Sequence, residues 1–180
     1  MSGIVLWITG LPCAGKSTLA ARAQAAARRE RLPAVLLDGD AVRAALLPAP
    51  GYDAAGRDQF EATLARLAAL IASQGFAVLV AATAHRRAWR DAARAMAPAF
   101  AEVHVATPLG VCERRDAKGL YAAARAGRVH HLPGLDARYE PPLSPEVTAT
   151  GGEDALAVQR MVALARAALT ARQVPGPPPT

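Results

Sequence analysis

The chain has 180 residues, of which 52% are hydrophobic and 4% aromatic, and it carries a formal net charge of +6 at pH 7. This length suits one α/β domain with a buried core, and the basic charge is compatible with nucleic acid or with a small polyanionic substrate. Because the sequence has no run of about 18 apolar residues and no basic run with interleaved aromatic residues, we expect neither a membrane nor a nucleic-acid partner.

The first predicted element is a buried strand, residues 4–8, which leads into a glycine loop and an alanine-rich helix. Residues 10–17 (GLPCAGKS) match the phosphate-binding pattern G-x-x-x-x-G-K-[ST] at every fixed position. In such a loop the backbone N–H groups and the helix N-terminus bind phosphate oxygens. Lys16 would reach the β- and γ-phosphates, and the Ser17 hydroxyl would bind Mg²⁺. The predicted ligands are therefore ATP and Mg²⁺, and the predicted phosphate-binding residues are Gly10, Leu11, Pro12, Cys13, Ala14, Gly15, Lys16, Ser17 and Thr18.

Two aspartates follow the next predicted strand. Residues 18–31 predict a helix and residues 34–37 a short buried strand, with Asp38 and Asp40 directly after it. In an open parallel sheet, ligands bind beyond this end of the strands. Asp40 is therefore predicted to act as the base for an acceptor hydroxyl or to orient it. Asp38 is predicted to bind Mg²⁺ through a water molecule. Arg43 is placed to clamp an anionic acceptor group. A solvated turn is the other interpretation of the aspartate pair.

The rest of the chain alternates between helices and strands. Helices are expected at residues 42–47, 57–74, 86–96, 108–115 and 153–172, and strands at 76–82, 100–106 and 147–150. The alternation predicts an α/β, three-layer, P-loop kinase-like fold, with a mostly parallel five-stranded sheet and helices on both faces. We expect one kinase domain over residues 1–172 and a disordered Pro-rich tail over 173–180.

The segment at residues 116–146 is rich in glycine and proline, and its pattern predicts an irregular lid. The two cysteines, Cys13 and Cys112, lack the spacing of metal ligands. Because Cys13 lies inside the phosphate loop, we expect reduced thiols and a cytoplasmic location.

Several motifs together resemble one family. They are the phosphate loop, residues 37–43 (LDGDAVR), 108–116 (PLGVCERRD), 118–121 (KGLY), and 134–136 (GLD) with 139–141 (YEP). This set resembles the adenylylsulfate kinases over about residues 3–148. The resemblance implies transfer of the γ-phosphate of ATP to the 3′-hydroxyl of adenosine 5′-phosphosulfate (adenylylsulfate, APS), which forms 3′-phosphoadenylylsulfate (PAPS) in sulfate activation. It also implies a small nucleotide as partner, with a homodimer as the candidate assembly.

The resemblance assigns further residues. It implies that Arg115 and Lys118, in the lid, close over ATP and its phosphates, although a solvated basic loop is the other interpretation. Tyr52 would stack on the acceptor base, with plain packing as its alternative, and Arg57 matches an arginine of the family.

The acceptor half of the motif set departs from the family pattern. Phe60 stands where the family has asparagine, Ala84 and His85 stand where it has Ser-Pro, and Leu132 stands where it has an aromatic wall. Such changes alter substrate preference, so a kinase acting on a different small nucleotide-type acceptor is the main alternative. An ATP-binding regulatory protein and a nucleic-acid kinase are weaker ones. The predicted acceptor-binding residues are Asp40, Arg43, Tyr52, Arg57, Phe60, Lys118 and Leu132.

Overall fold

The computed structural model describes residues 2–171, so the tail predicted for residues 173–180 lies outside the described residues. The strands are β1 (Ile4–Thr9), β2 (Ala34–Asp38), β3 (Ala77–Ala81), β4 (Phe100–Val105) and β5 (Val147–Ala149). The helices are α1 (Lys16–Arg29), α2 (Gly39–Ala45), α3 (Ala54–Ser73), α4 (Arg87–Met96), α5 (Leu109–Arg115), α6 (Leu120–Arg125) and α7 (Ala155–Thr170). Among residues 2–171, no helix combines the length and the hydropathy needed to cross a membrane.

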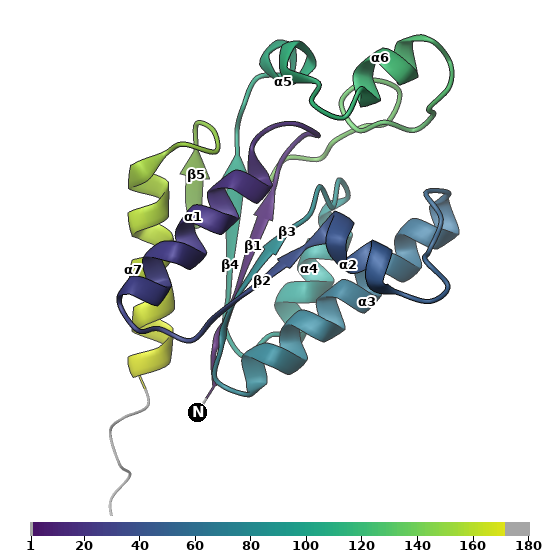
Figure 1. The fold of residues 1–180 in the computed structure, drawn as a ribbon. Helices are drawn as coiled ribbons and strands as arrows, with labels where there is room; N and C mark the ends of the chain where they lie inside the picture. Colours follow the sequence, from purple (N-terminus) through teal and green to yellow (C-terminus); the bar gives the residue numbers. More distant parts are fainter. Residues whose placement is uncertain (1, 172–180) are drawn as a thin grey trace, which may run out of the picture.

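The five strands form one sheet in the order β2-β3-β1-β4-β5, and every neighbouring pair is parallel. Helices α1 and α7 cover one face and α3 and α4 cover the other, while α5 and α6 lie beyond the carboxyl ends of the strands (Figure 1). The predicted three-layer α/β fold is therefore confirmed. Because ligands bind at the carboxyl ends of parallel strands, this end is where the site is expected.

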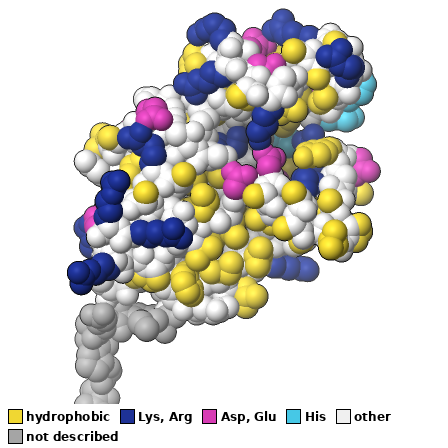
Figure 2. Space-filling view, viewed as in Figure 1, with side chains coloured by type: hydrophobic (Ala, Val, Ile, Leu, Met, Phe, Trp, Pro, Cys, Tyr) yellow, Lys and Arg dark blue, Asp and Glu magenta, His cyan; other side chains and the backbone are white. Residues whose placement is uncertain are grey.

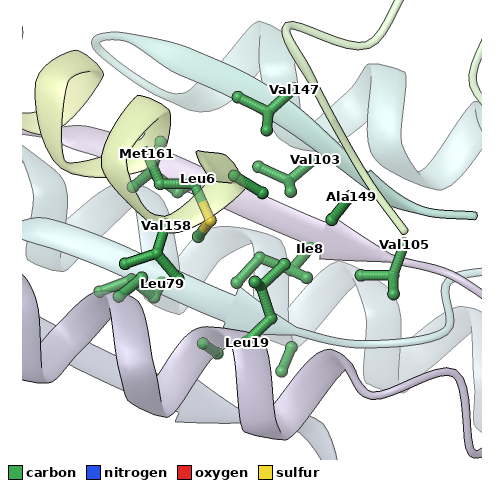
Figure 3. Close-up of a cluster of buried hydrophobic side chains, with 14 of the residues drawn as sticks. Leu6, Ile8, Leu19, Leu79, Val103, Val105, Val147, Ala149, Val158 and Met161 are labelled. Carbon is green, nitrogen blue, oxygen red and sulfur yellow. The ribbon is translucent and has the colours of Figure 1, made fainter. Parts of the chain in front are cut away.

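The central strand β1 is buried over its whole length, which explains its uninterrupted apolar sequence. Its side chains alternate between two clusters. Leu6 and Ile8 belong to the cluster packed on α1 and α7, where Leu19 and Met161 lie against the sheet (Figure 3). Trp7 belongs to the cluster on the opposite face, beneath α3 and α4. Burial on both faces fixes where the loop after β1 emerges.

Helices α2 and α3 each begin before the positions that the sequence predicted, residues 42 and 57, and in both an aspartate caps the helix. The Asp38 carboxylate accepts hydrogen bonds from the backbone N–H groups of Asp40 and Ala41, so α2 begins at Gly39. The Asp53 carboxylate accepts from the N–H of Gly56 at 2.7 Å, so α3 begins at Ala54. Capping satisfies backbone donors that would otherwise lack partners at a helix start.

The prediction that residues 116–146 are irregular throughout is wrong at α6. The sequence of this helix, LYAAAR, favours helix formation. The Asp116 carboxylate accepts hydrogen bonds from the N–H groups of Tyr121 and Ala122 at 3.0 and 2.9 Å, and so caps the helix start. The lid segment therefore carries a short helix of its own.

Candidate active site

The phosphate loop joins β1 to α1 and depends on glycine at its end. Gly15 has a φ of 105°, which only glycine adopts without strain. A Cβ at this position would also lie 2.7 Å from the backbone nitrogen of Gly152, in the turn after β5. Gly15 is thus required both by the backbone conformation and by the close approach of a second chain segment.

Lys16 begins α1 and its amine bends back over the loop. Its Nζ atom donates hydrogen bonds to the backbone carbonyls of Gly10 and Leu11, at 3.1 and 2.8 Å. Burial lowers the pKa of Lys16 to about 8, and the charge of Asp40 opposes this shift. An amine with a pKa this low changes charge close to physiological pH.

Ser17 and Asp38 lie in contact beside the phosphate loop. The Ser17 hydroxyl donates a hydrogen bond of 2.5 Å to the Asp38 carboxylate. Within residues 2–171, no group of three or more His, Cys, Asp and Glu side chains is arranged to hold a metal ion unaided. A hydroxyl and a carboxylate beside a phosphate site nevertheless fit Mg²⁺, which retains waters and takes its other ligands from the substrate phosphates.

Asp40 forms an ion pair with Lys118 of the lid segment. Both side chains are more than half exposed, and Figure 2 shows acidic and basic side chains meeting where the molecule is hollowed between the lid and helices α2 and α3. The hydrogen bond that Lys118 donates to the Asp40 carboxylate raises the pKa of Lys118, so the amine stays charged at neutral pH. The structure thus brings together the carboxylate and the lid cation that the sequence predicted for the site.

The lid also contacts the phosphate loop directly. The Arg115 guanidinium donates to the carbonyls of Cys13 and Ala14 at 3.4 and 3.3 Å. The buried Tyr121 hydroxyl donates to the carbonyl of Pro12 at 3.0 Å. Outside the lid, Thr107, which precedes α5, also donates to the carbonyl of Ala14 at 2.8 Å. Tyr121 and Thr107 were not predicted as site residues, although the KGLY motif contains the tyrosine.

The predicted acceptor residues of α2, of α3 and of the loop between them form an aromatic and cationic cluster. The Arg43 guanidinium lies 3.9 Å from the centroid of the Phe60 ring and 4.5 Å from that of Tyr52. Its Nη1 atom also donates to the carbonyls of Pro50 and Gly51 at 2.9 and 2.8 Å. The buried Phe60 ring therefore supports the Arg43 guanidinium from the core. A polar side chain at position 60 would instead need hydrogen-bond partners of its own.

Arg57 connects this cluster to the lid. It donates to the carbonyl of Tyr52 at 2.7 Å and to the carbonyl of His131 at 3.1 Å. The two expected walls of the acceptor base lie in different surroundings, because Tyr52 is 63% exposed and Leu132 only 5%. Leu132 belongs to the apolar cluster of α1 and α7, and not to the cluster that contains Phe60.

A buried ion pair lies behind the acceptor side. Arg90, 1% exposed, donates to Glu102 at 2.5 Å and to the carbonyls of Ala84 and Glu140 at 2.5 and 2.6 Å. These bonds hold the segment after β3 against the end of the lid.

Leu11 and residues of the segment 134–141 line a cavity of about 550 Å³ beside the phosphate loop.

A triphosphate-binding loop, with a carboxylate at the neighbouring strand end and a cationic lid above both, defines the class: this is a P-loop kinase. The family model for adenylylsulphate kinase matches residues 2–150, and the chain belongs to that family. The predicted resemblance is therefore confirmed, and so is the predicted activity, the ATP-dependent phosphorylation of APS to PAPS.

Curated relatives and solved structures agree with this assignment. The chain is 41% identical over 154 residues to an adenylyl-sulfate kinase of Synechococcus sp., covering 86% of this chain and 88% of the relative. It is 44% identical over 158 residues to the adenylyl-sulfate kinase of Shewanella oneidensis, covering 87% and 77%. The structure of the Mycobacterium tuberculosis APS kinase in complex with AMPPNP and APS superposes with a TM-score of 0.80 at 35% identity, covering 88% of this chain and 94% of the other.

Proposed function

We propose that the protein performs this phosphoryl transfer with Lys16 on the phosphates of ATP and Asp40 on the 3′-hydroxyl of APS. The observation that carries the assignment is the Asp40–Lys118 ion pair, because it joins the strand-end carboxylate to a cation of the lid beside the phosphate loop. The Mycobacterium tuberculosis relative, solved with AMPPNP and APS, supports binding of both nucleotides by a chain of this fold.

The chemistry asks for positioning and charge more than for a strong base. Phosphoryl transfer passes through a loose transition state, in which charge spreads over the γ-phosphate oxygens. The backbone N–H groups of the phosphate loop, in which only Pro12 lacks one, and the Lys16 ammonium would stabilise that charge. Asp40 would accept the hydrogen bond of the 3′-hydroxyl and hold its oxygen in line with the γ-phosphorus. The proton released by the hydroxyl would pass to this carboxylate.

Ser17 and Asp38 are the proposed Mg²⁺ residues. The Ser17 hydroxyl would bind the ion directly and Asp38 through water, in agreement with their 2.5 Å contact. When bound, the ion would neutralise charge on the β- and γ-phosphates of ATP.

The lid residues Arg115 and Lys118 are proposed to close over ATP. Arg115 already contacts carbonyls of the phosphate loop, and Lys118 is paired with Asp40. Closure excludes water, which would otherwise compete with the acceptor for the γ-phosphate.

On the acceptor side, the exposed ring of Tyr52 would stack on the adenine, and Arg43 and Arg57 would bind the phosphosulfate. The guanidinium groups of both arginines lie near this ring, at 4.5 and 6.0 Å from its centroid. Phe60 would act by supporting Arg43, and Leu132 would border the adenine from the lid.

A cytoplasmic location and a homodimer remain predictions, and light scattering of the purified protein tests the second.

An acceptor screen tests the proposal. ATP and Mg²⁺ are supplied with APS, with cytidine or uridine 5′-phosphosulfate, or with the 3′-deoxy analogue of APS, and ADP release is followed. We expect rapid turnover with APS and none with the 3′-deoxy analogue. Faster turnover with a pyrimidine analogue would contradict the proposed acceptor, and equal ADP release without any acceptor would contradict transfer to a nucleotide.

A further inference from the structure

Glu61, on helix α3, is a buried carboxyl group that the mechanism above leaves unused. Its residue is only 8% exposed, and its Oε2 atom has no hydrogen-bond partner. Burial of an unsatisfied carboxyl oxygen opposes folding, so such a group in a native protein calls for an explanation. Glu61 directly follows Phe60 and lies one helical turn after Arg57, which places it on the acceptor side of the molecule.

Three cations lie near enough to Glu61 to oppose the rise of its pKa, one on its own helix and one on each of two other helices. They are Arg43 from α2, Arg57 from α3 itself and Arg90 from α4. Their recorded hydrogen bonds go to backbone carbonyl groups and, for Arg90, to Glu102. The three arginines therefore concentrate positive charge at Glu61 without satisfying its Oε2 atom.

The positive charge around Glu61 favours the binding of an anionic ligand, provided that Glu61 itself is uncharged. An anionic group that enters among these arginines would be repelled by ionised Glu61. A protonated carboxyl group at the same place has an O–H to donate, and hydrogen bonds to charged oxygens are among the stronger ones. Arg90 is already paired with Glu102, so the oxyanion of the acceptor is the common partner that suits the orphaned carboxyl and the two arginines of the acceptor side, Arg43 and Arg57.

We propose that Glu61 binds the phosphosulfate group of the acceptor in its protonated form, donating a hydrogen bond to one of its anionic oxygens. The inference rests on the proposed function, because it takes APS as the acceptor. The proton comes from solvent and stays on Glu61, so that one proton is taken up when the acceptor binds and is released when the product leaves.

The electrostatics of the free protein support this role. Burial raises the pKa of Glu61 from its ordinary value of 4.5 to about 7, against the opposing pull of the three arginines. A bound anion would offset the charge of Arg43 and Arg57 and raise the pKa of Glu61 further. The charge on APS itself does not change between about pH 6 and pH 9, since phosphoric-sulfuric anhydrides are strong acids. Acceptor affinity should therefore fall as the pH rises above about 7, by up to about tenfold per unit.

Calorimetric titration of the folded protein with APS measures the proton directly. Repeating the titration at about pH 8 in two buffers of different ionisation enthalpy gives the number of protons taken up. We expect the wild type to take up close to one proton more than Glu61→Gln, whose amide N–H replaces the carboxyl O–H at every pH. Lys16, with a pKa of about 8, is present in both proteins and cancels in the comparison. Glu153→Gln, which changes an exposed carboxylate paired with Arg22, is the matched control and should behave as the wild type.

The pH series separates binding from a structural role. Acceptor affinity should be independent of pH in Glu61→Gln and at least as high as that of the wild type at about pH 8. Acceptor affinity should be low at every pH in Glu61→Met, whose side chain fills the space but donates no hydrogen bond. Binding of AMPPNP should be the same in all three proteins. Equal proton uptake in wild type and Glu61→Gln would overturn the inference alone. A folded wild type that does not bind APS at any pH would overturn the proposed acceptor, and this inference with it.

Discussion

The hydroxyl of Tyr121 donates a hydrogen bond of 3.0 Å to the backbone carbonyl of Pro12, and so joins the lid helix α6 to the phosphate loop. Both residues are buried. We expect Tyr121→Phe to keep the packing of the ring but to leave the Pro12 carbonyl without this donor, lowering the free energy of unfolding by about 1 kcal/mol. Denaturant unfolding measures this change. Tyr52→Phe removes an exposed hydroxyl and serves as the control; an equal loss in both variants would contradict a specific role for the Tyr121 bond.

Lys16→Ala should abolish phosphoryl transfer while the fold is retained. The amine contacts only carbonyl groups of its own loop, so few tertiary contacts depend on it, whereas the developing charge on the γ-phosphate requires a cation. Turnover and circular dichroism of the purified variant are the two measurements. Substantial turnover by a folded Lys16→Ala protein would refute the assignment of the phosphate loop.

The two aspartates should separate by their effects. Asp40→Asn keeps a hydrogen bond but loses the charge, so kcat should fall by about 10²-fold or more, as is usual when a general base is lost. Its affinity for ATP should change little, because the loop is untouched. Asp38→Asn should instead raise the Mg²⁺ concentration needed for activity, since Asp38 contacts Ser17. Measurement of kcat, ATP affinity and Mg²⁺ dependence for both variants tests this division. It fails if Asp40→Asn retains full kcat or if both variants lose only ATP binding.

The pKa of Lys16 should appear in the binding of ATP. Because burial lowers this pKa to about 8, the amine is charged below that pH and becomes neutral above it. Binding of a polyphosphate then requires uptake of a proton, so ATP affinity should fall above about pH 8, by up to about tenfold per unit. Titration with AMPPNP across this range measures the fall. Lys16→Arg keeps its charge throughout and should show a flat profile; the same slope in both proteins would exclude Lys16 as the cause.

Glu61 should also make stability depend on pH. Its folded-state pKa of about 7 lies above the ordinary 4.5, so the folded state holds the proton more tightly than the unfolded chain does. The corresponding stability is complete below about pH 4.5 and is lost as the pH rises to about 7, which amounts to about 3 kcal/mol. Relative to the wild type, Glu61→Gln should therefore gain stability between about pH 5 and pH 8, as measured by urea unfolding. A constant difference between the two proteins would contradict the raised pKa.

The parts of the molecule that were predicted from sequence are those fixed by short-range patterns. The apolar strand β1 and the glycine spacing of residues 10–17 determine the loop locally, and the alternation of elements determines the parallel sheet. The residues that the sequence did not reveal are buried by contacts between segments that lie far apart in the chain. Glu61 and Arg90 are charged residues on helices, which are usually exposed. They are buried here because α3 packs against α4 and the sheet, and because Arg90 is bonded to Glu102 of β4. Helix α6 was not predicted because the segment around it is rich in glycine and proline, which are typical of irregular structure.

The contact between Gly15 and Gly152 relates the two ends of the described chain. The loop that binds phosphate lies near the start of the sequence, yet its last glycine rests on the backbone of a turn that follows β5. During synthesis on a ribosome, residues 10–15 emerge well before the segment that supports them. The contact between the loop and this turn can therefore form only after about residue 152 has left the exit tunnel, so a phosphate loop with its full support should be among the last features that the growing chain acquires.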